Sequence, residues 1–269
     1  MEYTVEELDG KLNRLISILC KDEGIDINKF HLQTLSIGDK RVIFRGLSNQ
    51  RQPMPLSAEF IRLQDEILSY ERDHKFIIDV NSLGFSKNMT IYLGDITSIR
   101  ADAIVNAGNS RMLGSFDPCD SSIDNIIMSA GGLQIRQELS FLMNKQNNRP
   151  EPNGRAKLTK GYNLPANYII HTVGPIIFDK VSYHDKIDLA NCYKSCLDMA
   201  LENKFKNIVF CCIATGTFKF PRELASKIAV TTVSKWLEEH NYPLNVVFCV
   251  YNDFDRKLYE EQFRELNII

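Results

Sequence analysis

The chain has 269 residues, 44% of them apolar and 25% charged, which allows one large domain or one domain with an extension. Its formal net charge is −2 and it has no long block of like charge, so the charge pattern gives no support for nucleic-acid binding. The seven cysteines are odd in number and lie mostly within apolar runs, which indicates reduced thiols of a cytoplasmic protein. The acidic N-terminus lacks the apolar core of a secretory signal, and the apolar runs are too short to span a membrane.

Residues 1–85 carry apolar side chains at the spacing of helices. One stripe runs from Leu8 to Leu19 and a second from Phe60 to Leu68. The segment 45–55, rich in Arg and Pro, is expected to be irregular, and Ser57 can cap the second helix without a full capping box. No catalytic cluster occurs in this part, so we predict a helical N-terminal extension.

From residue 86 to 269, short apolar strands alternate with amphipathic helices. The predicted strands are 90–93, 103–105, 168–173, 207–213 and 245–251. The predicted helices are 123–144, 185–203, 223–239 and 255–266. This alternation is typical of an α/β domain with a mostly parallel sheet covered by helices.

Polar residues follow the first two of these strands. Asp95 lies in the turn G-D-I-T, and a turn Asp commonly caps its own backbone. Asn106 and Asn109 flank the turn Ala107-Gly108, where Asn side chains can stabilise the backbone or project amides from the end of the strand. Such strand ends are also where open α/β sheets hold phosphorylated ligands, so both readings stay open.

A second glycine loop, residues 214–218, follows the fourth strand. Gly216 permits a backbone to approach a phosphate closely, and Pro221 is expected to open the next helix. Tyr251 ends the last strand, either as an aromatic that stacks on a ligand or as an ordinary strand residue. His171 offers no visible partner and is expected to be structural.

Taken together, the motifs G-D-I-T, D-A-I-V-N-A-G-N-S, T-K-G-Y-N-L-P-A-N-Y-I-I-H-T-V-G-P and T-G-T-F-K-F-P resemble those of the macrodomain family, over nearly the whole chain. The resemblance implies a three-layer α/β/α fold with a mixed, mostly parallel sheet over residues 86–269. It implies ADP-ribose, free or attached to protein, as the ligand, with no membrane or nucleic-acid partner and no cofactor. The ligand-binding residues that it implies are Asp95, Ile96, Asn106, Gly114, Ser115, Thr215, Gly216, Thr217, Phe218 and Tyr251.

The long extension and the insertion between Leu113 and Ile123 most resemble the zinc-dependent, hydrolytic macrodomains. Where that subgroup has Cys, His, Cys and His, this chain has Ser115, Asp120, Ser122 and Met128. The loop retains Cys119, with Asp117 and Asp120 beside it, which is a poor zinc set. We therefore predict no bound metal.

Asp124 matches the Asp that positions a water or the distal ribose in zinc-free macrodomain hydrolases, and Asn109 matches the ribose-contacting residue. At a helix N-terminus the anion of Asp124 is favoured, which predicts a weak base, or simply an acidic residue that stabilises the helix. The resemblance thus implies hydrolysis of mono-ADP-ribose from protein side chains, with Asp124 and Asn109 as catalytic residues. The alternative is a non-catalytic reader of ADP-ribosylated protein.

Overall fold

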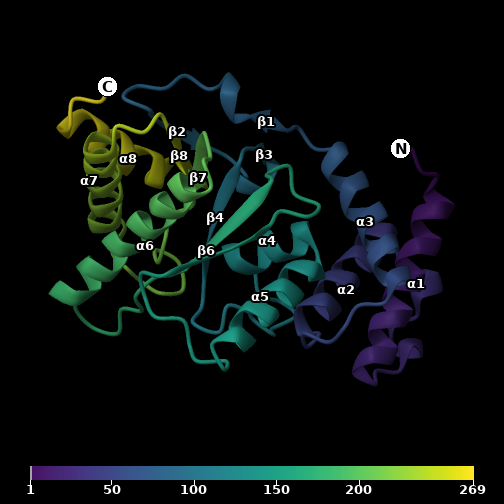
Figure 1. The fold of residues 1–269 in the computed structure, drawn as a ribbon. Helices are drawn as coiled ribbons and strands as arrows, with labels where there is room; N and C mark the ends of the chain where they lie inside the picture. Colours follow the sequence, from purple (N-terminus) through teal and green to yellow (C-terminus); the bar gives the residue numbers. More distant parts are fainter. Residues whose placement is uncertain (1) are drawn as a thin grey trace.

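In the computed structural model, which describes residues 2–269, three N-terminal helices stand beside an α/β sandwich (Figure 1). The sandwich is built on a six-stranded sheet of order β2-β8-β7-β4-β6-β5. Its strands are β2 (Met89–Leu93), β4 (Ala103–Gly108), β5 (Ala156–Lys160), β6 (Tyr168–Val173), β7 (Asn207–Phe210) and β8 (Asn245–Val250). All neighbouring pairs are parallel except β5 with β6, which confirms the mixed, mostly parallel sheet.

Helices cover both faces of this sheet, which gives the three layers that the sequence predicts. Figure 1 shows α4 and α5 on the side of the N-terminal helices and α6, α7 and α8 on the other. Their bounds are α4 (Ile123–Gly131), α5 (Leu133–Lys145), α6 (Tyr183–Glu202), α7 (Arg222–His240) and α8 (Asp253–Glu265). A separate pair of short parallel strands, β1 (Ile78–Asp79) and β3 (Ile99–Arg100), joins the extension to the sandwich.

The N-terminal helices are α1 (Val5–Glu23), α2 (Ile37–Gln50) and α3 (Ala58–Asp73). They enclose a core of their own, whose buried residues include Leu15, Phe44 and Phe60. The larger core is formed by the sheet and the helices on both of its faces, and it already includes Val80. The boundary after residue 85 stays a prediction, because a domain boundary implies that each part folds on its own.

Two predicted elements are wrong, and three strands, β1, β3 and β5, were not predicted. Residues 45–50 are not irregular but form the end of α2, which Ser36 begins through a capping box with Asp39. The predicted helix 123–144 is two helices, because Gly132 has φ +104° and the Gln64 side chain from α3 accepts a hydrogen bond from Leu133 N at 2.9 Å. Strand β5 was missed because its A-K-L-T-K run is half-buried at the edge of the sheet.

Smaller features follow the sequence more closely. Ser57 caps α3 through Phe60 N, without a capping box. Pro221 lies one residue earlier than expected, at the N-cap of α7. All seven cysteines are free thiols, and only Cys119 is exposed. Within residues 2–269, no helix combines the length and the apolarity that crossing a bilayer requires.

Candidate active site

The candidate residues follow strands that end at one edge of the sheet. Strands β2, β8, β7 and β4 are parallel, with Leu93 beside Val250 and Ile104 beside Val209. The segments that leave their carboxyl ends therefore emerge along the same edge. This arrangement brings Asp95, Tyr251 and two loops together, here named the first edge loop (residues 109–116) and the second edge loop (residues 214–218).

Asp124 is the buried carboxylate of this edge. It lies in the first turn of α4, which Ser122 caps, and it is 5% exposed. Asn106 Nδ2, at the end of β4, donates to Asp124 Oδ1 at 2.7 Å, and a Cβ at Gly108 would lie 3.5 Å from Oδ2. Burial raises the pKa of Asp124 to about 6, although the Asn106 hydrogen bond and the charge of Arg136 act against that rise. Asp124 is therefore a stronger base than its helix position predicted.

A chain of hydrogen bonds holds Asn106 in place. Asn106 Nδ2 lies 3.0 Å from His171 Nδ1, and His171 Nε2 lies 2.8 Å from Thr159 Oγ1. Since an amide nitrogen only donates, His171 accepts at Nδ1 and carries its proton on Nε2. Burial lowers the pKa of His171 to about 3, so the ring is neutral. His171 is structural, as predicted, but its role is to orient the amide that holds Asp124.

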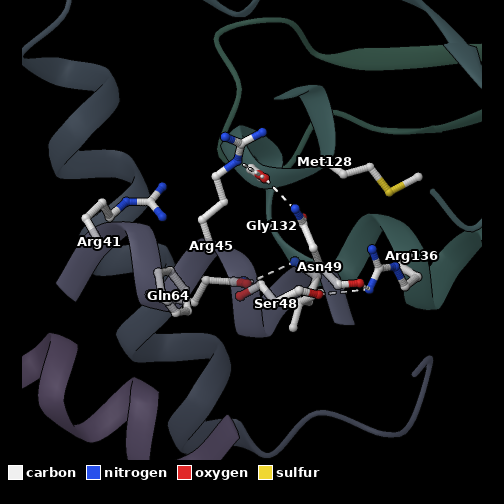
Figure 2. A pocket seen from close by; sticks show the side chains of 11 residues that line it. Arg41, Arg45, Ser48, Asn49, Gln64, Met128, Gly132 and Arg136 are labelled. Atoms are coloured by element: carbon white, nitrogen blue, oxygen red, sulfur yellow. Dashed lines mark hydrogen bonds between the residues drawn. The ribbon is translucent and has the colours of Figure 1, made fainter. Parts of the chain in front are cut away.

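Arg136 carries a positive charge into the same region from α5. It is 2% exposed, and its Nη1 donates to the carbonyl oxygens of Ser48, Asn49 and Arg51, at the end of α2, within 3.0 Å. Figure 2 shows Arg136 beside Ser48 and Asn49. Its guanidinium lies 5.0 Å from the ring centre of Phe116. Burial lowers the pKa of Arg136 to about 10, so it remains a cation at neutral pH. The end of α2 thus holds a charge that stabilises the Asp124 anion.

Side chains fix the shape of the first edge loop. Asn109 Oδ1 accepts from Arg111 N at 2.9 Å, and Asn109 Nδ2 donates to Gly114 O at 3.0 Å. Asn125 Oδ1 accepts from Ser115 N at 3.0 Å, so this N–H is already paired. Gly114 has φ +75°, and a Cβ there would lie 2.9 Å from Asn125 Oδ1. The amides of Asn109 therefore support the loop, and Gly114 is needed for its turn.

The second edge loop leaves its backbone amides free. Within residues 2–269, no acceptor is found for the N–H groups of Gly216, Thr217 and Phe218. Ala214, with φ 63°, turns the chain, and a Cβ at Gly216 would meet nothing within 4 Å. Phe218 packs against the larger core. Consecutive free N–H groups beside open space suit an anion such as a phosphate.

Asp95 and Tyr251 stand at the β2–β8 end of the edge. Asp95 Oδ1 accepts from Thr97 N at 2.8 Å and from Thr97 Oγ1 at 2.7 Å, and Lys75 Nζ lies 3.5 Å from Oδ2. Burial alone would raise the pKa of Asp95, but these hydrogen bonds and Lys75 outweigh it and lower the pKa. The Ile96 side chain is buried, whereas Tyr251 is 83% exposed. Asp95 is thus a turn residue that stays ionised, and its side chain is 43% exposed.

The residues at the subgroup's zinc positions do not fit a zinc ion. Ser122 caps α4, and Asp120 accepts from Ser122 N at 2.7 Å. Ser115 Oγ accepts from Asp117 N at 3.1 Å, and Asp117 in turn accepts from Cys119 N at 2.9 Å. Each polar group closes a local turn, and no cluster of three His, Cys, Asp or Glu suited to a metal occurs within residues 2–269.

Sequence reasoning missed the supporting residues Asn125, Thr159 and Arg136. Asn125 follows Asp124 directly, and this was the one signal available for it. Thr159 lies on β5, which was not predicted, and Arg136 lies within a helix whose predicted continuity hid its contact with α2. These three act through other side chains, so no short motif marks them.

Comparison with known proteins gives a consistent result. The Macro domain family profile matches residues 105–229. The chain is 44% identical over 263 residues, 97% of each chain, to a protein of Staphylococcus aureus (strain MSSA476) named protein-ADP-ribose hydrolase. A protein of the same name from Treponema medium is 42% identical over 83% of this chain and 87% of its own. The solved Trypanosoma brucei macrodomain in complex with ADP-ribose superposes with a TM-score of 0.62 at 29% identity, covering 77% of this chain and 91% of that one.

Proposed function

The chain belongs to the macrodomain family, and we propose that it binds ADP-ribose and hydrolyses mono-ADP-ribose from modified protein side chains. The observation that carries the hydrolase is Asp124, a buried carboxylate that Asn106 holds near the edge where the second edge loop leaves three consecutive N–H groups without an acceptor among residues 2–269. The names of the relatives support the same reaction.

The ligand would lie along the carboxyl edge of the sheet. Adenine would lie between Asp95 and Tyr251, near Ile96, because a half-open carboxylate can accept its exocyclic amine. The diphosphate would rest on the second edge loop, Thr215 to Phe218, and on the N–H of Gly114, since the N–H of Ser115 is already paired. The distal ribose would then lie near Asn109 and Asp124, with Asn106 behind.

The reaction needs a base that is ionised near neutral pH. With a pKa of about 6, Asp124 is mostly anionic at pH 7 and still able to take a proton. A water held at Oδ2, for which no hydrogen-bond donor is found within residues 2–269, attacks the anomeric carbon of the distal ribose. The bond from that carbon to the side-chain oxygen breaks, the protein carboxylate leaves with the electron pair, and Asp124 receives the proton.

We further propose that this chemistry proceeds without zinc or any other cofactor, because the groups at the subgroup's zinc positions are used in local turns. The partners would be ADP-ribose and mono-ADP-ribosylated protein, with no nucleic acid or membrane. The free, mostly buried thiols support a cytoplasmic location.

Release of ADP-ribose from a protein mono-ADP-ribosylated on Asp or Glu tests the proposal. Single-turnover assays would compare wild type with Asp124→Asn, each with added zinc and with a chelator. We expect release by wild type under both conditions and a loss of about 10² or more in the variant. Calorimetry with free ADP-ribose is the control, and its affinity should change only modestly. Equal release by Asp124→Asn and wild type would overturn the mechanism.

The second candidate is a reader that binds ADP-ribosylated protein without cleaving it. The specific observation in its favour is that Ser115, Asp120 and Ser122 replace the ligands on which the hydrolytic subgroup depends. Tight binding of ADP-ribose with no release from modified protein, with or without zinc, would establish the reader.

A further inference from the structure

A cavity of about 210 Å³ lies where the N-terminal helices meet the sandwich, and it reaches the carboxyl edge at Asp95. Its walls come from α2, α3, α4, the turn after β2 and the segment 163–165 before β6. Since a water occupies about 30 Å³ of liquid, this space is large enough for an ion such as pyrophosphate together with water. Apart from Asp95, the residues that line it take no part in the function proposed above.

The walls of the cavity carry more positive than negative charge. Four cations line it, Arg41, Arg45, Arg72 and Lys75, against the two carboxylates of Glu71 and Asp95. Arg41 pairs with Glu71, and Lys75 lies 3.5 Å from Asp95. No carboxylate lies within ion-pair distance of Arg45 in the part of the chain that the structure describes, and Arg72 pairs with Asp73, which does not line the cavity.

Neutral groups of the sandwich hold the two remaining guanidinium groups. Arg45 Nη2 donates to Asp120 O at 2.8 Å and its Nε to Ser129 Oγ at 3.3 Å. Arg72 Nη1 donates to Asn163 O at 3.4 Å. A guanidinium has five N–H donors in a planar fork, so each of these groups is held in place with donors to spare. Figure 2 shows Arg41 and Arg45, which are neighbours along α2.

We propose that this cavity is a second binding site, for a phosphate-type oxyanion such as pyrophosphate or the phosphates of a nucleotide. Arg45, which is held in place without a carboxylate partner, and the spare donors of Arg72 favour an oxyanion. Charge-assisted hydrogen bonds from Arg are strong, and they cost little ordering when the donor is already held. A bound anion would also neutralise the positive charge of Arg45. Arg45 donates to the carbonyl oxygen of Asp120, in the loop that leads into Asp124.

Calorimetric titration of inorganic pyrophosphate tests the site, with the full chain already saturated with ADP-ribose. We expect pyrophosphate still to bind, and Arg45→Gln to weaken it about tenfold or more through the loss of a charged donor. Arg72→Gln, on a different helix, should weaken pyrophosphate binding as well. A loss in both variants would show that the effect does not come from a folding defect in one of them. Arg62→Gln is the matched control, because Arg62 lies on α3, is exposed and pairs with Glu66 instead.

A further arm separates this site from the edge and distinguishes the source of the anion. Gly216→Val, which blocks the second edge loop, should bind pyrophosphate like wild type. In that variant, ADP binding more tightly than pyrophosphate would identify a nucleotide ligand, and equal affinities would identify a free oxyanion. The proposal is overturned if pyrophosphate does not bind, if ADP-ribose displaces it, or if Arg45→Gln and Arg72→Gln both bind it like wild type. These outcomes do not depend on whether the protein is a hydrolase.

Discussion

The first and second edge loops lie at the same edge of the sheet, but they are held in different ways. In the first, side chains occupy the backbone groups: Asn125 binds Ser115 N, and Asn109 spans the turn to Gly114. In the second, the backbone alone makes the turn at Ala214, and three consecutive N–H groups find no acceptor among residues 2–269. The comparison indicates that the first loop is built to hold a shape beside Asp124, while the second is built to receive an anion.

The N-terminal helices reinforce this difference, because they contact the segment that follows the first loop. Asn49 Nδ2 donates to Pro118 O at 3.4 Å, and a Cβ at Gly46 would lie 3.4 Å from Pro118 Cβ. Arg45 donates to Asp120 O, and Arg136 joins the end of α2 to the region of Gly114. The extension therefore supports the part of the site that carries Asp124.

The largest effect is expected from Gly216→Val in the second loop. The branched side chain would fill the open space above the free N–H groups and exclude a diphosphate. Losing two or more charge-assisted hydrogen bonds of about 1.5 kcal/mol each should weaken ADP-ribose about a hundredfold. Calorimetry measures the affinity, and thermal melting should be unchanged, because nothing lies within 4 Å of the new Cβ. Normal affinity in this variant would mean that the second loop is not the phosphate site.

Asp95→Ala gives a loss of affinity with which the loop variants can be compared, because Asp95 lies in neither loop. Its carboxylate holds Thr97 and would bind adenine through Oδ2. Removing one hydrogen bond to a charged acceptor costs about 1.5–3 kcal/mol, so ADP-ribose should bind roughly tenfold or more weakly. Comparing ADP-ribose with ribose 5-phosphate in the same titrations isolates adenine. An equal loss for both ligands would contradict the adenine assignment.

Gly114→Ala tests whether the first loop is held by its shape. Its left-handed backbone, φ +75°, and the Cβ contact of 2.9 Å with Asn125 Oδ1 should cost about 1–2 kcal/mol of stability. Urea denaturation should show a lower midpoint at an unchanged slope. Gly216→Ala is the matched control and should leave the midpoint unchanged, because Gly216 has neither the positive φ nor a close neighbour. If both variants were equally stable, the two loops would not differ as described.

The sequence predicted the parts of the molecule that local patterns encode. Strand β6, Tyr168–Val173, has the predicted bounds because β-branched and aromatic residues dominate its sequence, Y-I-I-H-T-V, and favour a strand. The order of motifs along the chain also placed Asp95 and the second loop at strand ends and Asp124 at the start of a helix. Whether those residues contact ADP-ribose stays a prediction.

What the sequence could not predict depends on contacts between distant segments. Gly132 ends α4 because Gln64, from a different helix, binds Leu133 N in place of the next helical turn. The pKa of Asp124 is raised by burial, whereas its place in the first turn of a helix predicted a favoured anion and a weak base. The contact of Arg136 with the last carbonyl groups of α2 requires a helix that extends to Gln50, which the sequence pattern did not predict.

The smallest effect is a shift in pH dependence, and it tests whether the extension acts on the first loop through charge. Since hydrolysis needs the Asp124 anion, the rate should fall as pH drops through about 6. Asp120 raises this pKa and Arg136 lowers it, whereas Asn106 is neutral and His171 does not titrate above about pH 3. Arg136→Gln removes the charge that favours the anion, so the pKa of Asp124 should rise and the acid limb should move to higher pH.

Arg136→Lys is the control that separates charge from shape, because it keeps the cation but cannot reproduce the fork that binds the carbonyl groups of α2. Both variants should lower the melting temperature, yet only Arg136→Gln should move the acid limb. A carboxyl carbon-13 titration of Asp124, assigned with Asp124→Asn, reads the same pKa without any hydrolysis. If the titration midpoint of Arg136→Gln matches wild type, Arg136 serves only to hold α2 against the sandwich. If it rises in Arg136→Gln and stays in place in Arg136→Lys, the charge that α2 holds against the sandwich helps to set the base strength of Asp124.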